Sequence, residues 1–284
     1  MLKPTVTFRQ RRALGQKLSA TFDFIEQNYK PLFSSLVVIA GLPALLAGIL
    51  QGYVQTSALQ LIIGRSPKMN LQELMAPVSM GIVLLTMFSY LLATAVVVNY
   101  MALYEEKGNT EKITVAMVWE QVKANVLLIT WGYVLTICVT LLFTILLIIP
   151  GIYMGICIQF FMFAIVFEKL TPQKSLHRSY DLVKREWWGT VLFVIVISIL
   201  SSLAALIIQL PFIILGIFEY FHVGEDMLAL KPVIIFVAMS VSLIVLFAKA
   251  LVWIGFGFQY FHLIEVENSR NKRFNFPSET EGDS

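Results

Sequence analysis

The stretch "SLHRSYDLVKREWW", residues 175–188, is a charged segment between two long apolar runs, "IYMGICIQFFMFAIVF" at 152–167 and "GTVLFVIVISILSSLAALIIQL" at 189–210. Apolar side chains recur in it at spacings of four, three and four, which places them on one face of a helix: Leu176, Tyr180, Val183 and Trp187. The other face carries His177, Arg178, Asp181, Lys184 and Arg185. Such a helix lies in a membrane interface, with its apolar face among acyl chains and its charges in water.

The composition places the chain among integral membrane proteins. Hydrophobic residues make up 58% of the 284 residues and charged residues 14%, against about a quarter charged in soluble proteins. The net charge of +3 is too small to indicate a nucleic acid partner. No apolar core precedes residue 31, so we expect no cleavable signal peptide.

Six apolar stretches reach, or nearly reach, the length of about 20 residues that a membrane-spanning helix needs: Pro31–Tyr53, Ala76–Leu103, Val126–Ile149, Ile152–Phe167, Gly189–Leu210 and Pro232–Tyr260. Only Pro150 and Gly151 separate the third from the fourth, which predicts a tight hairpin turn there, the alternative being a single kinked segment. The short segment Pro211–Phe221 either prolongs the fifth span or lies at the interface.

The predicted fold is therefore all-α: a polytopic membrane protein of six transmembrane helices arranged as three hairpins. The hairpins cover about 31–103, 126–167 and 189–260, and each follows a cytoplasmic amphipathic interfacial helix. Residues 1–30 form a cytoplasmic segment that contains the first of these helices. Residues 261–284 form a polar cytoplasmic tail that we expect to be disordered.

The distribution of basic residues predicts that both termini face the cytoplasm. With the N-terminus inside, 17 of the 21 Lys and Arg residues lie in inner segments. The outer loops hold only Arg65, Lys68 and Lys231, and Lys249 lies inside the sixth span. Because Lys and Arg are retained on the cytoplasmic side, this asymmetry decides the orientation.

The interfacial pattern occurs three times. The strings "FDFIEQN" (22–28), "WEQVKAN" (119–125) and "YDLVKRE" (180–186) each begin with an aromatic residue followed by an acid, and each runs into the first span of a pair. We interpret this as three repeated units, each a surface helix followed by a hairpin. The alternative is that three unrelated amphipathic helices align on their apolar stripes.

The run "IIPGIYMGICIQFFMFAIVFEKLTPQKSLHRSYDLVKREWWGTVLFVIVI" resembles a pattern in bacterial membrane proteins. It is similar to the membrane domain found with some glycerophosphoryl diester phosphodiesterases and to the YciC-like family. The matching features are the turn at Pro150, the acid Glu168 at the end of a span, and Leu176, Ser179 and Lys184 in the helix that follows. The resemblance implies a protein of the bacterial cytoplasmic (inner) membrane. Phosphodiesterase activity in this group requires a separate soluble catalytic domain, which we do not expect after Tyr260.

Ionisable groups inside membrane spans are costly and mark functional sites. None of the 18 acidic residues lies inside a predicted span, and we expect no catalytic residues, metal ligands or cofactor. The exception to the uncharged interior is Lys249, which with Gln159, Ser242 and Asn99 forms a candidate polar intramembrane site. Such a site could hold a lipid phosphate or another anion. Alternatively, Lys249 extends toward water.

The leading functional hypothesis is a non-catalytic scaffold or regulatory subunit of a membrane assembly. Its partners would be membrane lipids and one or more membrane proteins. The candidate docking face consists of Arg178, Asp181, Lys184, Arg185, Glu120 and Lys123. The alternative is a small transporter or lipid-handling protein with a site between the hairpins near Lys249 and Gln159. The spacing of Gly151 and Gly155 permits close helix packing, within the chain or between chains.

Overall fold

The computed structural model describes residues 6–62, 71–108, 112–222 and 227–274. Within these ranges the regular structure is helical, and no strand occurs. The elements are α1 (Leu14–Leu36), the π-helix η1 (Val37–Gly41), α2 (Leu42–Ile62), α3 (Leu71–Lys107), α4 (Val115–Leu146), α5 (Ile148–Ile158), α6 (Phe161–Phe167), α7 (Pro172–Val183), α8 (Trp187–His222) and α9 (Met227–Phe274). The predicted all-α class is confirmed.

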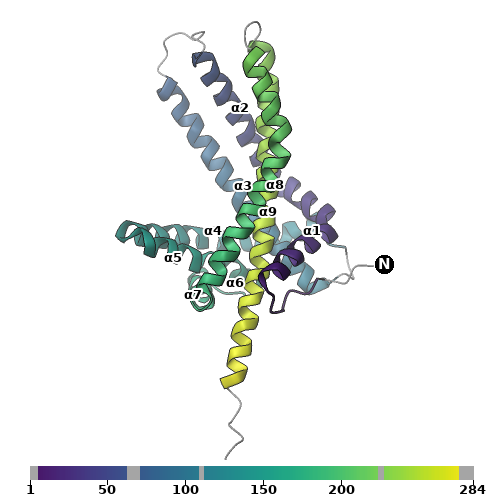
Figure 1. Ribbon diagram of the computed structural model, residues 1–284, viewed down its shortest axis with the longest axis vertical. Helices are drawn as coiled ribbons and strands as arrows, with labels where there is room; N and C mark the ends of the chain where they lie inside the picture. Colours follow the sequence, from purple (N-terminus) through teal and green to yellow (C-terminus); the bar gives the residue numbers. More distant parts are fainter. Residues whose placement is uncertain (1–5, 63–70, 109–111, 223–226, 275–284) are drawn as a thin grey trace, which may run out of the picture.

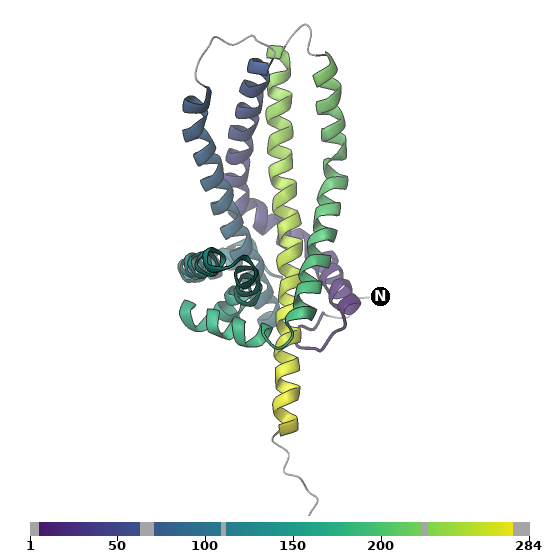
Figure 2. The same cartoon turned by 60° about the vertical axis from the view of Figure 1, so that its left-hand side comes forward.

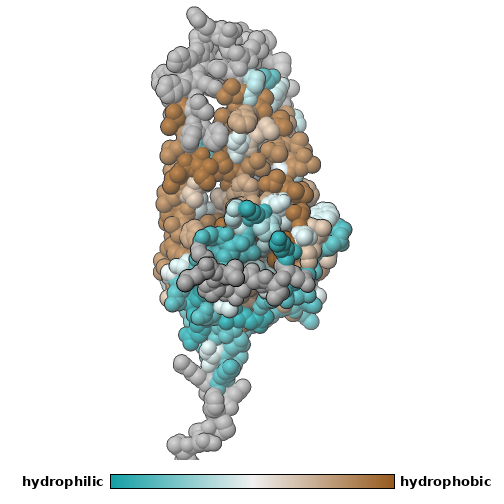
Figure 3. Space-filling view, turned by 90° about the vertical axis from the view of Figure 1, so that its right-hand side faces the viewer, coloured by the Kyte–Doolittle hydropathy of each residue, from teal (hydrophilic) through white to brown (hydrophobic). Residues whose placement is uncertain are grey.

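Six helical segments in the described ranges are long and apolar enough to cross a membrane: Leu14–Ser57, Pro77–Lys107, Val115–Leu146, Ile148–Phe167, Trp187–Leu210 and Lys231–Lys272. The chain is a multi-pass membrane protein. Figure 3 shows a broad hydrophobic band around the long helices and a hydrophilic surface at the end of the molecule from which α9 emerges. This contrast follows from the sequence, in which apolar runs alternate with short charged segments.

Four helices, α2, α3, α8 and α9, run along the long axis of the molecule (Figure 1, Figure 2). α2 packs against both α3 and α9, and α8 packs against α9. The contact between α2 and α9 depends on two glycines spaced four residues apart. A Cβ atom on Gly48 would lie 2.7 Å from the Cα of Met239, and a Cβ atom on Gly52 would lie 2.7 Å from the Cα of Ile235. Only glycine permits backbones to approach this closely.

Helices α4 and α5 take a different direction. In Figure 1 they extend sideways from the four long helices, and in Figure 2, after a 60° turn, α4 and α5 are seen nearly end-on. The predicted spans 126–149 and 152–167 were expected to lie alongside the others. Instead the pair, which packs as an antiparallel hairpin, crosses the long axis.

The turn of this hairpin is earlier than predicted. Leu147 alone, with extended backbone (φ −158°, ψ 136°), separates α4 from α5. Pro150 lies in the first turn of α5, where proline removes no helical hydrogen bond. Gly151 and Gly155 face α4, since a Cβ atom on them would lie 2.7 Å from the Cα of Thr144 and 3.5 Å from the Cγ2 of Thr140. Their spacing therefore serves packing within the chain.

Several predicted boundaries differ in the structure. α1 begins at Leu14, within the segment predicted to hold the first amphipathic helix, but it continues past the predicted boundary at Pro31 and through η1 into α2, with a change of direction visible in Figure 2. Residues 211–221 prolong α8. Residues 261–274, expected to belong to a disordered tail, continue α9, whereas 275–284 lie outside the described residues. The end of α9 is held by contacts from two sides, since the Phe8 ring stacks on Phe261 and Arg178 of α7 forms an ion pair with Glu267.

An aromatic cluster holds the hydrophilic end together. The Phe8 ring stacks on Phe261 at 5.3 Å and contacts Phe258 at 5.5 Å, and the Phe24 ring lies 5.0 Å from Tyr104. All five side chains are buried. The cluster joins the segment before α1 to α1, α3 and α9, and it thereby positions the surface on which the candidate site is built.

Candidate functional site

The site lies where α6, α7 and α9 meet. α6 ends at Phe167, and Lys169 then adopts a left-handed conformation (φ 52°) that reverses the chain. Thr171 has extended backbone at the N-cap position of α7, and Pro172 follows in the first turn, where the fixed backbone angle of proline suits a helix. α7 is thus turned back against α5 and α6.

Ser179 connects α7 to the break between α5 and α6. Its hydroxyl donates to the carbonyl oxygen of Cys157 at 2.7 Å and accepts from the amide N–H of Phe160 at 3.1 Å. Ser179 is fully buried, so these bonds satisfy backbone groups that the helix break leaves unpaired. The serine that the resemblance singled out therefore has a structural function.

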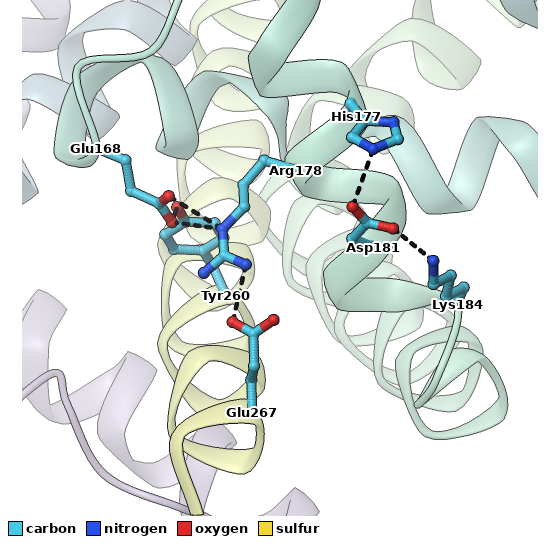
Figure 4. A network of polar contacts seen from close by, with 7 residues as sticks. All are labelled: Glu168, His177, Arg178, Asp181, Lys184, Tyr260 and Glu267. Atoms are coloured by element: carbon cyan, nitrogen blue, oxygen red, sulfur yellow. Dashed lines mark hydrogen bonds and ion pairs between the residues drawn. The ribbon is translucent and has the colours of Figure 1, made fainter. Parts of the chain in front are cut away.

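Arg178 is the centre of an ion-pair network, which we call the junction network: Glu168, Arg178, Tyr260 and Glu267 (Figure 4). The Nε of Arg178 donates to both carboxylate oxygens of Glu168, at 3.2 and 3.0 Å, and its Nη1 lies 2.8 Å from Glu267 Oε2. The Tyr260 hydroxyl donates to Glu168 at 2.6 Å. The network ties α7 to the end of α6 and to two positions on α9 that lie about two turns apart.

The two carboxylates of this network stabilise the charged form of Arg178 by more than burial destabilises it. Partial burial of Arg178 disfavours its charged form, but hydrogen bonds and charge interactions with Glu267 and Glu168 outweigh that cost and raise the pKa of its guanidinium. About a quarter of each charged side chain remains exposed. Arg178, predicted to be part of a docking face, is thus engaged within the molecule.

The outer face of α7 carries a second group of charges, which points away from the junction network (Figure 4). Asp181 accepts from Lys184 and lies 3.2 Å from the Nε2 of His177. The hydrogen bond from Lys184, opposed by partial burial, lowers the pKa of the Asp181 carboxyl. Lys184 and its neighbour Arg185 are exposed, and His177 keeps 79% of its side chain in contact with solvent.

The other predicted docking residues lie on α4. Lys123 forms an ion pair with Glu120 at 2.7 Å, and both side chains are largely exposed. Lys123 also lies over the ring of Trp119 at 5.8 Å. Unlike the ion pairs of Arg178, which join α7 to other elements, this pair is formed within α4.

Of the four residues of the predicted intramembrane site, only Lys249 and Ser242 lie in one neighbourhood, which they share through Tyr90. Lys249 is exposed on α9, with its ammonium 6.0 Å from the ring centre of Tyr90. Tyr90 also lines a cavity of about 120 Å³ between α2, α3 and α9, and Ser242 lines the same cavity. Asn99 instead accepts from Asn125 of α4 at 2.6 Å.

The fourth predicted residue, Gln159, lies at the break between α5 and α6, where its buried Nε2 has no hydrogen-bond partner. It does not line the cavity beside Tyr90. Among the described residues, no group of three or more His, Cys, Asp or Glu side chains could hold a metal ion.

Sequence reasoning missed two sets of contacts. Tyr260 and Glu267 are seven residues apart on α9, a spacing that places both on one helix face and could have indicated their shared partner. The second set is buried: Lys17 Nζ donates to Gln259 Oε1 at 2.6 Å, and Gln259 Nε2 donates to Thr190 at 3.0 Å. No sequence pattern connects these three residues, because they come from three distant helices.

A family described as a domain of unknown function, DUF7847, matches residues 112–261, which is more than half of the chain. The chain belongs to the DUF7847 family. The DUF7847 region holds Glu168, Arg178 and Tyr260, while Glu267 lies beyond it. No curated protein and no solved structure matches the chain. The resemblance to the phosphodiesterase-associated membrane domain stays a prediction.

Proposed function

We propose that this DUF7847 protein is a non-catalytic scaffold or regulatory subunit of a membrane assembly, with α7 as its docking element. The observation that carries the proposal is the division of charges on α7. Arg178 faces inward and is bound by Glu168 and Glu267, whereas the group around Asp181 and Lys184 faces outward. A helix fixed on one face loses little conformational freedom when its other face binds a partner.

The proposed docking face therefore consists of His177, Asp181, Lys184, Arg185, Glu120 and Lys123, without Arg178. Its charges are of both signs, which favours a partner with complementary polar groups over a purely electrostatic ligand. The partner would be a membrane protein, because the face lies beside helices that are apolar enough to enter a membrane.

The proposal also includes the membrane in which the protein lies, the side of its termini and the order of its hairpins. The chain would lie in the bacterial inner membrane with both termini in the cytoplasm, and the three hairpins would follow three amphipathic surface helices. On α1, the side chains of Phe22 and Tyr29 are exposed, whereas Leu18 and Ile25, which share their helical spacing, pack partly against the core. The exposed aromatic pair is the part of α1 that would contact lipid.

Crosslinking mass spectrometry in native membranes tests the scaffold proposal. We expect Lys184 and Lys123 to form reproducible crosslinks to a second membrane protein, and the double variant Lys184→Glu, Arg185→Glu to lose that protein on purification. Lys272→Glu is the matched control, because it reverses an exposed charge at the end of α9, away from α7. If neither lysine has a protein neighbour, the scaffold proposal is wrong.

A second candidate, a transporter or lipid-handling protein, is favoured by the surroundings of Lys249. No carboxylate of the described residues lies within ion-pair distance of its ammonium, and the nearby cavity is lined by the polar side chains of Thr86, Ser89, Tyr90 and Ser242. A lysine without an acidic partner inside a span could bind a lipid phosphate.

Native mass spectrometry with anionic phospholipid tests the second candidate. Lys249→Met should lose bound lipid, while Lys249→Arg should retain it because the positive charge is kept. Equal lipid retention by Lys249→Met and the wild type would exclude a phosphate site at this lysine.

A further inference from the structure

We infer that the α4–α5 hairpin does not cross the membrane but lies within the cytoplasmic leaflet, with its apolar surface among lipid acyl chains. The inference starts from its direction: the hairpin lies across the four helices α2, α3, α8 and α9, in both views (Figure 1, Figure 2). If those four helices cross the bilayer, a hairpin at a steep angle to them runs roughly parallel to the membrane plane.

The height of the hairpin agrees with the inner boundary of the bilayer. The segment that directly follows the hairpin, and so marks the height of its root, contacts α9 through the Phe160 and Phe256 rings at 5.5 Å and, from α6, through the Phe163 and Tyr260 rings at 5.5 Å. From Lys231, the basic residue at the outer part of α9, to Phe256 the helix rises about 37 Å at 1.5 Å per residue. This exceeds the hydrocarbon thickness of about 30 Å by about 7 Å. The root therefore lies at the cytoplasmic boundary between acyl chains and headgroups.

The positions of the tryptophan side chains indicate the same depth in the membrane. The chain has five, and they lie on the hairpin or beside it: Trp119, Trp131, Trp187, Trp188 and Trp253. Trp187 stacks on Tyr153 of α5 at 5.4 Å, and Trp253 contacts Phe256 at 5.1 Å. Tryptophan concentrates where acyl chains meet headgroups. A hairpin that crossed the membrane would carry its far end well away from this level.

The far end of the hairpin requires an apolar environment on all sides. Its exposed side chains are Leu141, Leu142, Ile145, Leu146, Leu147, Ile148 and Ile149, with 81% of Ile145 and of Ile149 uncovered. The long helices α2, α3 and α8 expose side chains of the same kind, among them Leu42, Leu46, Met80, Leu84, Leu192 and Ile195. Acyl chains that cover these helices in a bilayer are also the occupant that suits the exposed side chains of the hairpin.

A groove on the hairpin supports the same occupant. It measures about 570 Å³ and is lined by Val139, Phe143, Pro150, Tyr153, Met154, Ile158, Leu176, His177 and Tyr180. The groove extends from the hairpin to α7, which contributes Leu176, His177 and Tyr180. His177 and Tyr180 place polar groups at the α7 end of the groove. This arrangement suits a lipid whose acyl chain lies along the hairpin and whose headgroup lies near α7.

The angle of the hairpin is maintained by specific polar contacts at its root. Tyr133 donates to Thr94 at 3.2 Å, and Asn125 donates to Asn99 at 2.6 Å, both joining α4 to α3. Ser179 joins α7 to the end of α5. A hairpin aligned with the other spans would have to break these bonds in an environment without water, where each unpaired group is costly.

Single-cysteine labelling tests the inference. Ile137→Cys and Ile149→Cys, at the middle and the end of the hairpin, are made in a Cys138→Ala background, and buried Cys157 is kept. Lys231→Cys and Lys272→Cys serve as controls for the two sides of the membrane. Intact cells receive a membrane-impermeant maleimide, and purified variants carrying a fluorophore are reconstituted in vesicles with quenchers at shallow and deep acyl positions.

We expect that the maleimide, applied from the side on which it labels Lys231→Cys, does not label Ile149→Cys. We also expect the shallow quencher to quench the fluorophore equally at positions 137 and 149. If Ile149→Cys is labelled as readily as Lys231→Cys, or if position 137 is deep and 149 is not, the hairpin spans the membrane and the inference is wrong. Quantitative disulfide-linked dimers at position 149 without lipid quenching would also overturn it, because a second chain would then cover the hairpin.

Discussion

The close contact between α2 and α9 predicts that Gly48→Ala destabilises the protein. The new Cβ would lie 2.7 Å from the Cα of Met239 and 2.9 Å from the carbonyl oxygen of Ala238, both backbone atoms that cannot rotate away. Carbon atoms in ordinary contact are about 3.5–4.0 Å apart, so the two helices must separate locally by about 1 Å. Overpacking of this kind costs about 1–3 kcal/mol, and the better helix propensity of alanine offsets up to about 1 kcal/mol. We expect a net loss of about 1–2 kcal/mol.

Gly81→Ala is the matched control, because it makes the same change in α3, where the nearest atom is the flexible Leu50 Cδ1 at 3.9 Å. It should be neutral or slightly stabilising. The free energy of unfolding can be measured by SDS titration in mixed micelles, followed by the fluorescence of the native tryptophans. Equal free energies of unfolding for Gly48→Ala and Gly81→Ala would refute the argument that backbone approach at Gly48 holds α2 against α9.

Three further substitutions test the contacts that α7 makes, both within itself and with neighbouring elements. Ser179→Ala should cost about 1–3 kcal/mol, since two buried backbone groups lose their partner; Ser175→Ala, whose hydroxyl bonds only the nearby Pro172 carbonyl, should cost less in the same titration. Glu267→Gln should lower stability by up to about 1 kcal/mol in low salt, with a smaller difference at high salt, because the ion pair with Arg178 is partly exposed. The lowered pKa of Asp181 means that its stabilisation is present above its ordinary value of 3.8 and is lost as pH falls below it. Melting curves from pH 7 to 3 should therefore show a larger acid-dependent loss in the wild type than in Asp181→Asn, and equal losses would contradict this.

The class of fold and the location of the apolar segments could be predicted from the sequence, because hydropathy and helical spacing are local properties. The charged segment whose spacing predicts a helix is helical in the structure from Pro172 to Val183. The turn between α4 and α5 was predicted three residues late, because proline is compatible both with a turn and with the first turn of a helix.

The candidate site was less predictable. Arg178 and Lys184 belong to the same charged segment, yet one binds two carboxylates and the other faces outward. The difference depends on Glu267, which is 89 positions away along the chain from Arg178. Likewise, Lys249 and Ser242 share the neighbourhood of one cavity through Tyr90, whereas Asn99 pairs with Asn125.

The sequence by itself determined that this chain is an all-helical membrane protein with charged segments between apolar helices. Its composition leaves the backbone no other way to satisfy its hydrogen bonds in lipid. Only the tertiary structure decided the direction of each helix. An apolar run has the same hydropathy whether it stands beside its neighbours or lies across them, and the choice is made by distant contacts such as those of Tyr133 with Thr94 and of Ser179 with Cys157.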